Sequence, residues 1–163
     1  MNWSLFGNHL WANVAGVSTA GEIPAATAGA PSREDSIVVA GLIAFAVVNL
    51  AIAAMLTFAP HAFFEDIGPY GAQNDHYMRD IATFYAAIGV AGLIACRRRS
   101  WRTPVLCLLA LQYGLHAINH LADIGAAHTR WLGPANFASL AVATAALVWL
   151  ARESARSPEV QRS

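Results

Sequence analysis

Four apolar runs, each close to the length of a membrane-spanning helix, dominate this chain of 163 residues. They cover residues 36–58, 80–96, 103–126 and 132–150. A helix needs about 20 predominantly apolar residues to cross the ~30 Å hydrocarbon core of a bilayer. The composition agrees, since 56% of the residues are hydrophobic and 12% are charged, about half the charged fraction of a soluble domain. The sequence therefore predicts an all-α integral membrane protein, a four-helix bundle embedded in the lipid bilayer.

Capping residues predict where these helices begin and end. Ser36 is the expected N-cap of the first span, and Pro60 is expected to stop it. Thr103 and Pro104 are the expected cap and first turn of the third span. We expect residues 151–163 to form a C-terminal tail, a short solvated helix end followed by disorder. Residues 1–35 lack the features of a signal peptide, and we expect an amphipathic surface helix there or a disordered tail.

Arginines, which are the only basic residues besides histidine, are distributed unevenly about the four spans. One side of the predicted bundle receives eight of them: Arg33, Arg97, Arg98, Arg99, Arg102, Arg152, Arg156 and Arg162. The other side receives Arg79 and Arg130. The positive-inside rule places the arginine-rich side in the cytoplasm, so both termini are predicted to be cytoplasmic. The formal net charge of zero argues against nucleic acid as a partner.

The third span carries a stripe of polar side chains along one face. At about 100° per residue, these side chains project within roughly a third of the helix circumference: Gln112, His116, Asn119, His120 and Asp123. Polar residues inside a membrane turn toward protein or water rather than toward lipid. We therefore expect a polar pocket built on span three, opening on the side opposite the arginines.

A metal site is one interpretation of the stripe. His116 and His120 are four residues apart on a helix, so both imidazoles can reach one ion, and Asp123 adds a carboxylate. Asp80 or His76 completes the four ligands expected around zinc or a similar divalent metal.

A pocket that handles protons without a metal is a second interpretation. His116 and His120 would donate or accept protons, and Asp123 would orient one imidazole. Arg79 and Asp80 would shape the entrance. Further contacts to a ligand are expected from Gln112, Asn119 and His76. A third interpretation is purely structural, with polar side chains such as Asn49 forming hydrogen bonds between helices.

The loop before the second span contains the turn residues Gly68, Pro69 and Gly71 followed by a dense polar run. This loop is predicted to be either an ordinary connection or a lid, with Tyr70, His76 and Tyr77 facing the pocket.

Four short spans, with Asp66-Ile67-Gly68 and the run from His76 to Asp80 before the second span, resemble small bacterial membrane proteins of the DoxX-like kind. The histidine stripe of span three is similar to that of uncharacterised four-span relatives from high-GC bacteria. The resemblance extends over residues 36–150. It implies a multi-pass protein of the bacterial inner membrane, and some DoxX-like proteins are associated with quinone-linked redox complexes.

These observations lead to one functional hypothesis and two alternatives, and they leave open whether the protein is an enzyme. The leading hypothesis is that the polar pocket binds or transforms a small amphipathic ligand, such as a quinone or a lipid head group. One alternative is a non-enzymatic accessory subunit of a membrane complex, which uses its apolar faces for contacts with partners. The other is a metal-binding or transport protein. The partners expected besides the lipid bilayer are further copies of the chain in a homo-oligomer or the subunits of a larger membrane complex.

Overall fold

The computed structural model describes residues 32–156, and within them the chain is helical. The elements in chain order are α1 (Arg33–Phe58), α2 (Pro60–Asp66), α3 (Asp75–Arg97), α4 (Arg99–Ala122) and α5 (Leu132–Arg156). An isolated bridge between Tyr70 and Ala127 is the only β-type pairing in this described part. The predicted all-α fold is confirmed for these residues. Of the predicted tails 1–35 and 151–163, residues 33–35 belong to α1 and residues 151–156 to α5. The expectations for residues 1–31 and 157–163 lie outside the described part of the chain.

Four of the helices, α1, α3, α4 and α5, are long and apolar enough to cross a membrane. Each matches one of the apolar runs of the sequence. Large apolar side chains remain exposed along their outer faces, for example Leu111, Leu115 and Ile118 of α4. Apolar side chains exposed along the outer face of a membrane-length helix are typical of a surface that faces lipid.

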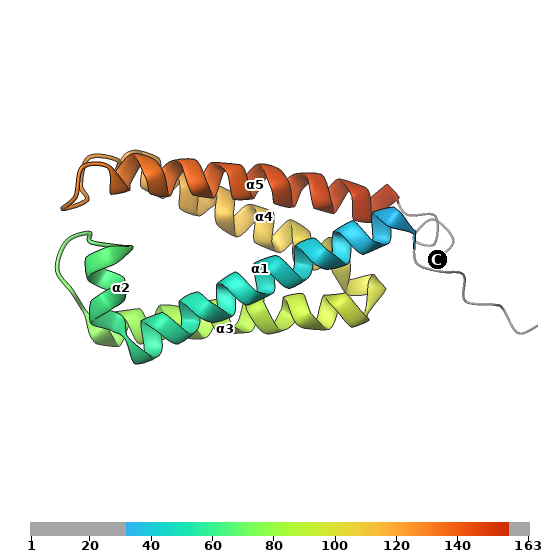
Figure 1. Cartoon of the computed structure of the whole chain (residues 1–163), viewed down its shortest axis with the longest axis horizontal. Helices are drawn as coiled ribbons and strands as arrows, with labels where there is room; N and C mark the ends of the chain where they lie inside the picture. The colour runs from blue at the N-terminus through green and yellow to red at the C-terminus, as the bar shows by residue number, and fades with distance from the viewer. Residues whose placement is uncertain (1–31, 157–163) are drawn as a thin grey trace, which may run out of the picture. The chain divides into compact units, whose positions relative to one another are not determined.

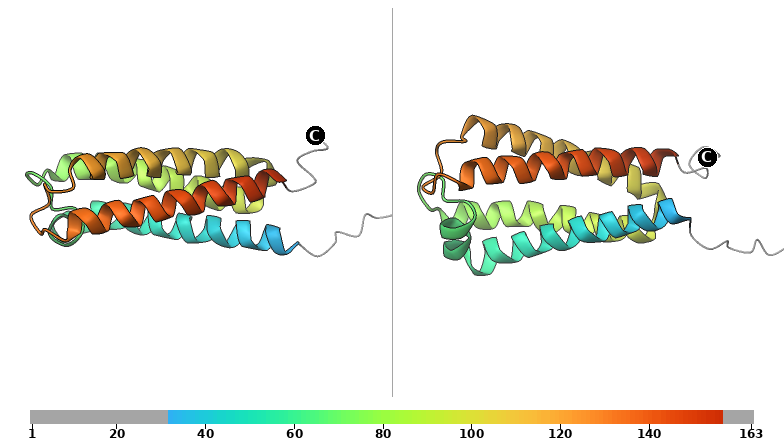
Figure 2. Two further views of the ribbon diagram at one scale, coloured as in Figure 1. Left: turned by 90° about the horizontal axis from the view of Figure 1, so that it is seen from above. Right: turned by 45° about the horizontal axis from the view of Figure 1, so that its top comes forward.

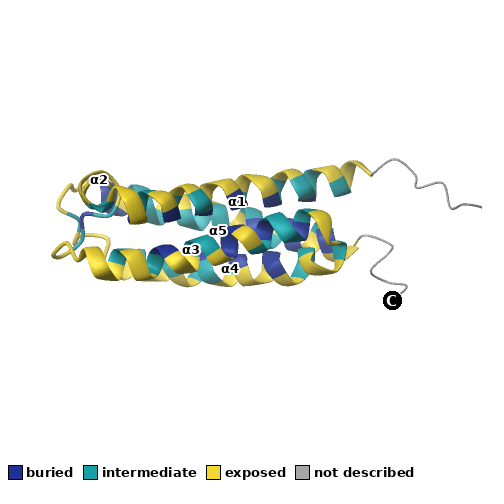
Figure 3. Ribbon diagram, turned by 90° about the horizontal axis from the view of Figure 1, so that it is seen from below, coloured by how far each residue is buried: buried dark blue, intermediate teal, exposed yellow. Residues whose placement is uncertain are grey.

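The helices associate in two pairs. α1 packs along α3, and α4 packs along α5, while contacts between α3 and α4 and between α1 and α5 join the pairs. The two pairs lie close together where α1 begins and separate toward the end that carries α2 (Figures 1 and 2). We call the first of these the arginine end and the second the α2 end. Buried positions lie where helices face one another, and exposed positions face outward (Figure 3).

Close helix approach, rather than bulky side chains alone, holds the first pair together. A Cβ atom added to Gly89 of α3 would lie 2.7 Å from the Leu50 Cγ atom and 3.2 Å from the Ala46 carbonyl oxygen of α1. A Cβ atom added to Gly92, one turn further along α3, would likewise contact α1. Small residues at helix contacts are expected in a membrane, where van der Waals packing drives association.

One polar side chain is completely buried in the middle of the bundle. The Nδ2 atom of Asn49 donates to the Phe45 carbonyl oxygen (2.7 Å) and to the Tyr113 hydroxyl oxygen (3.1 Å). The prediction that Asn49 forms a hydrogen bond between helices is thereby confirmed. Its Oδ1 atom is buried and accepts no hydrogen bond from the described residues.

Two predicted caps are wrong. Ser32, not Ser36, caps α1, because its Oγ atom accepts a hydrogen bond from the Asp35 amide (3.1 Å). Pro104 lies inside α4 rather than in its first turn. Arg98 alone separates α3 from α4, so α4 already begins at Arg99, and the Thr103 hydroxyl instead forms a hydrogen bond with Ser154 Oγ of α5 (2.9 Å).

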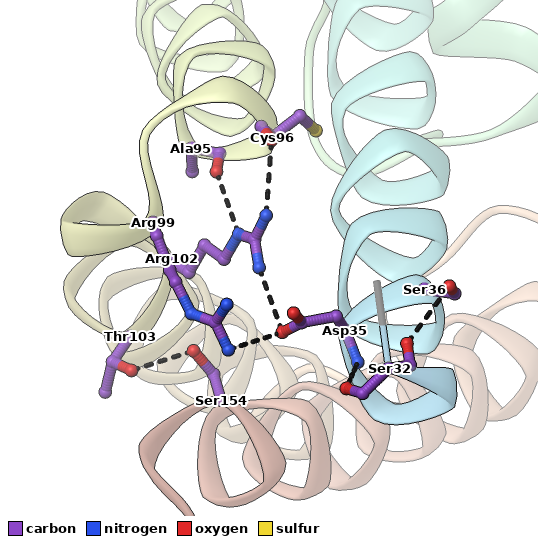
Figure 4. Close-up of polar contacts among 9 residues, drawn as sticks. All are labelled: Ser32, Asp35, Ser36, Ala95, Cys96, Arg99, Arg102, Thr103 and Ser154. Carbon is purple, nitrogen blue, oxygen red and sulfur yellow. Dashed lines mark hydrogen bonds and ion pairs between the residues drawn. The ribbon is translucent and has the colours of Figure 1, made fainter. Parts of the chain in front are cut away.

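Ion pairs at the arginine end connect α1 to the start of α4 (Figure 4). The Asp35 Oδ1 atom lies 2.8 Å from Arg99 Nη2 and 3.3 Å from Arg102 Nη1. Arg102 also donates to the carbonyl oxygens of Ala95 (3.4 Å) and Cys96 (3.5 Å) at the end of α3. A cation at a helix C-terminus and an anion in a first turn both complement the helix dipoles. This cluster fixes three helix ends relative to one another.

Candidate functional site

A cavity of about 280 Å³ lies between the two helix pairs toward the α2 end. All five helices and the loop after α2 contribute to its lining. The apolar part of the wall is formed by Ile52, Leu56, Phe63, Ile67, Ile81 and Leu140. The polar part is formed by Tyr70, Tyr85, His116, His120, Asn136 and Ser139. A mostly apolar concave surface with a few polar groups is typical of a site for a small ligand.

A chain of hydrogen bonds joins three of the polar lining residues. The Nε2 atoms of His116 and His120 lie 3.1 Å apart, and His120 Nδ1 lies 3.1 Å from the Tyr70 hydroxyl oxygen. The rings also pack together, with centroids 4.8 Å apart for the two histidines and 5.1 Å apart for Tyr70 and His120. Both ring nitrogens of His120 are therefore engaged, and Tyr70 orients this imidazole.

The chain can run in either direction. In one arrangement the Tyr70 hydroxyl donates to His120 Nδ1, and His120 Nε2–H donates to His116 Nε2. In the other, His116 Nε2–H donates to His120 Nε2, and His120 Nδ1–H donates to the Tyr70 oxygen. Each nitrogen is a donor in one neutral tautomer and an acceptor in the other. The two arrangements differ only in where the protons sit, which is the property that a proton-exchanging site requires.

The loop after α2 brings Tyr70 to the histidines because it is attached to the α4–α5 connection. The His128 amide donates to the Pro69 carbonyl oxygen (3.1 Å), next to the bridge between Tyr70 and Ala127. Asn136 Nδ2 of α5 donates to the Ile67 carbonyl oxygen (3.0 Å). The loop therefore forms part of the cavity wall and joins the two helix pairs at this end.

Only part of the predicted stripe reaches the cavity. His116 and His120 line it, whereas Gln112, half-buried, and Asn119 and Asp123, both exposed, do not. Asp123 is the C-cap residue of α4, where the helix ends earlier than the sequence predicted.

The predicted entrance residues on α3 also lie off the cavity. His76 Nε2 lies 3.5 Å from Asp80 Oδ2, and both side chains are exposed. Arg79 is exposed as well. Of the three loop and helix-start residues expected to face inward, Tyr70 lines the cavity, while His76 and Tyr77 do not.

The structure brings few possible metal ligands together at the predicted metal site. Within residues 32–156, no group of three or more His, Cys, Asp or Glu side chains is arranged to hold a metal ion. His116 and His120 contribute two adjacent nitrogens, whereas catalytic zinc sites use three protein ligands and structural sites use four.

Sequence reasoning missed Tyr85 and did not place Ser139 at the site. Tyr85 lies on α3 one turn beyond Ile81, and both line the cavity. A tyrosine inside a transmembrane helix, away from the interfacial belt, is the signal that could have found it. Ser139 donates to the Asn136 carbonyl oxygen (2.9 Å), and this places both residues on the face of α5 that lines the cavity.

Residues 38–152 match the model of a family described as a domain of unknown function (DUF4345). The chain belongs to this family. The match covers α3 and α4 completely, most of α1 and α5, and the whole cavity lining. No curated protein and no solved structure matches the chain. The four apolar helices make this DUF4345 protein a multi-pass membrane protein.

Proposed function

We propose that this DUF4345 protein binds a small amphipathic ligand in the cavity at the α2 end. His116 bonds the ligand's polar group through the ring nitrogen that does not contact His120, and His120, both of whose ring nitrogens are engaged, holds His116 in place. The observation that carries the proposal is the hydrogen-bonded chain of Tyr70, His120 and His116 on the wall of an otherwise apolar cavity. Ionisable groups inside a membrane are costly and mark ligand or proton paths.

The position of the cavity supports an amphipathic rather than a fully polar ligand. Most of its apolar wall is supplied by helices long enough to span the bilayer, with Phe63 and Ile67 supplying the rest, so the apolar part of a membrane ligand would remain in an apolar environment. The polar groups come from α3, α4, α5 and the loop, and a few such groups in an apolar site fix the orientation of a ligand's polar part.

The membrane orientation belongs to the same proposal. Among the described residues, Arg33, Arg97, Arg98, Arg99, Arg102, Arg152 and Arg156 lie at the arginine end. By the positive-inside rule this end is cytoplasmic, so the cavity lies nearer the opposite face of the membrane. The resemblance to DoxX-like proteins suggests the bacterial inner membrane as the location and a quinone or lipid head group as the ligand.

The test is a binding assay on the full chain in detergent micelles, with 2-methyl-1,4-naphthoquinone and short-chain phosphatidylglycerol as probes. His120→Asn removes one of the two ring nitrogens that connect the chain, and His76→Asn is the matched control because His76 is exposed and off the cavity. Losing one hydrogen bond of about 1 kcal/mol lowers affinity about fivefold.

We expect isothermal titration calorimetry to detect binding of one probe, weakened by His120→Asn and unchanged by His76→Asn. Circular dichroism and gel filtration verify that both variants stay folded. Failure of both probes to bind, or equal binding by the two folded variants, would refute the proposal.

A further inference from the structure

We infer that the ligand of this cavity is an uncharged compound with carbonyl or hydroxyl oxygens and a ring head group of about two fused six-membered rings. This inference rests on the proposed function and narrows it to a ligand class. It excludes an anionic lipid head group as the part that enters the cavity.

The absence of fixed charge in the lining carries the first half of the inference. Among the described residues that line the cavity, the polar ones are two tyrosines, two histidines, an asparagine and a serine, and none is Asp, Glu, Lys or Arg. The two arginines of the α2 end that could hold an anionic head group, Arg79 and Arg130, are exposed and do not line the cavity.

An anion that enters such a cavity loses its hydration, and the wall holds no permanent cation to replace it. Burying an unpaired charge costs far more than burying a hydrogen-bonded neutral group. The groups that can become cationic here are His116 and His120, and each already uses its Nε2 atom to bond the other. The lining therefore favours a neutral ligand.

The remaining hydrogen-bonding capacity of the wall suits hydroxyl and carbonyl groups. The Ser139 hydroxyl donates its hydrogen bond to the Asn136 carbonyl oxygen. The Asn136 side-chain amide donates to the Ile67 carbonyl oxygen. The Ser139 oxygen and the Asn136 Oδ1 atom keep their lone pairs for a ligand hydroxyl. Tyr85 adds a phenolic group that can donate to a ligand carbonyl.

Volume sets the size of the head group. A 150 Å³ apolar cavity in a protein holds one benzene molecule, and this cavity is about 280 Å³. The space therefore accommodates about two fused rings. A third ring, or a long apolar tail, has to remain outside it.

The test compares four probes on the full chain in micelles by isothermal titration calorimetry. 2-Methyl-1,4-naphthoquinone and 1-naphthol are neutral two-ring compounds, 2-naphthoate is an anion of the same size, and 9,10-anthraquinone adds a third ring. Leu140→Trp fills the cavity, and Leu108→Trp is its control because Leu108 lies exposed on α4.

We expect at least one neutral two-ring probe to bind, naphthoate and anthraquinone to bind at least about tenfold more weakly, and Leu140→Trp but not Leu108→Trp to abolish binding. His120→Asn, as a second variant, keeps the test valid if Leu140→Trp fails to fold. Naphthoate binding as tightly as the neutral probes would overturn the charge argument, and anthraquinone doing so would overturn the size argument, while the proposed function would stand. If no probe and no phosphatidylglycerol binds, both fail.

Discussion

Asp35→Asn should destabilise the bundle more than its place at a helix end would suggest. The carboxylate bonds both Arg99 and Arg102, and the Asp35 and Arg102 side chains are each 13% exposed. A hydrogen bond to a charged group contributes about 1.5–3 kcal/mol. We take about 2 kcal/mol for Arg102, which is shielded, and about 1 kcal/mol for Arg99, which is 31% exposed and more strongly screened. This isosteric substitution should therefore lower the free energy of unfolding by about 3 kcal/mol. That value is at the lower limit of the loss expected when one partner of a buried ion pair is removed.

The assay is reversible unfolding in mixed micelles with increasing sodium dodecyl sulfate, monitored by circular dichroism. Arg156→Gln provides the matched control, because Arg156 pairs with Glu153 at the same end but is 71% exposed, and exposed pairs contribute about 0–1 kcal/mol. A double-mutant cycle with Arg102→Met isolates the coupling between Asp35 and Arg102. If Asp35→Asn costs no more than Arg156→Gln, the ion-pair cluster does not hold the three helix ends as described.

Two further predictions concern the α2 end. Gly133→Ala should cost about 2 kcal/mol or more in the same assay, because the added Cβ would collide with a backbone carbonyl of the α4–α5 connection. Gly125→Ala, which meets open space, should be nearly neutral, and equal costs would contradict this packing. His61 lies outside the spans, where a hydrogen bond with Gln73 and then the charge of Glu65 raise its pKa above 6.5. NMR titration should show this raised pKa, and Glu65→Gln should lower it; an unchanged value would remove Glu65 as a cause.

The helical architecture was predictable because the apolar sequence of each span is by itself enough to specify a helix. An apolar run long enough to cross a bilayer must form a helix, since a lipid environment leaves the backbone no other way to satisfy its hydrogen bonds. Helix ends were less predictable, since they depend on what the neighbouring helix offers. Thr103 resembles an N-cap in sequence, but Ser154 of α5 takes its hydroxyl. The ion pairs of Asp35 with Arg99 and Arg102 were not predicted for the same reason, since Arg102 lies 67 residues away from Asp35 in sequence.

The site was predictable where it depends on one helix and not where it depends on packing. The spacing of His116 and His120 places them together on any α-helix, and the structure brings their Nε2 atoms to 3.1 Å. Helical periodicity also put Asp123 on this face, but α4 ends at Ala122, so Asp123 leaves the helix as its cap. Tyr70 replaces it as the partner of His120, through a loop pairing that no local pattern encodes.

The distribution of polar groups along the bundle bears on what a DUF4345 protein can do. The polar lining of the cavity occupies the α2 end, and one buried pair, Asn49 with Tyr113, lies further in. Beyond that pair, the largest fully buried side chains toward the arginine end are Val38, Leu42, Leu106, Leu109 and Leu147. Moving an ion or a proton through this layer would require a continuous polar path, and a tightly packed apolar layer offers no hydrogen-bonding groups to form one. The cavity is thus closed on the arginine side within the described residues. A cavity closed on the arginine side is compatible with the proposed binding of a ligand, and it disfavours conduction across the membrane by a single copy of the chain.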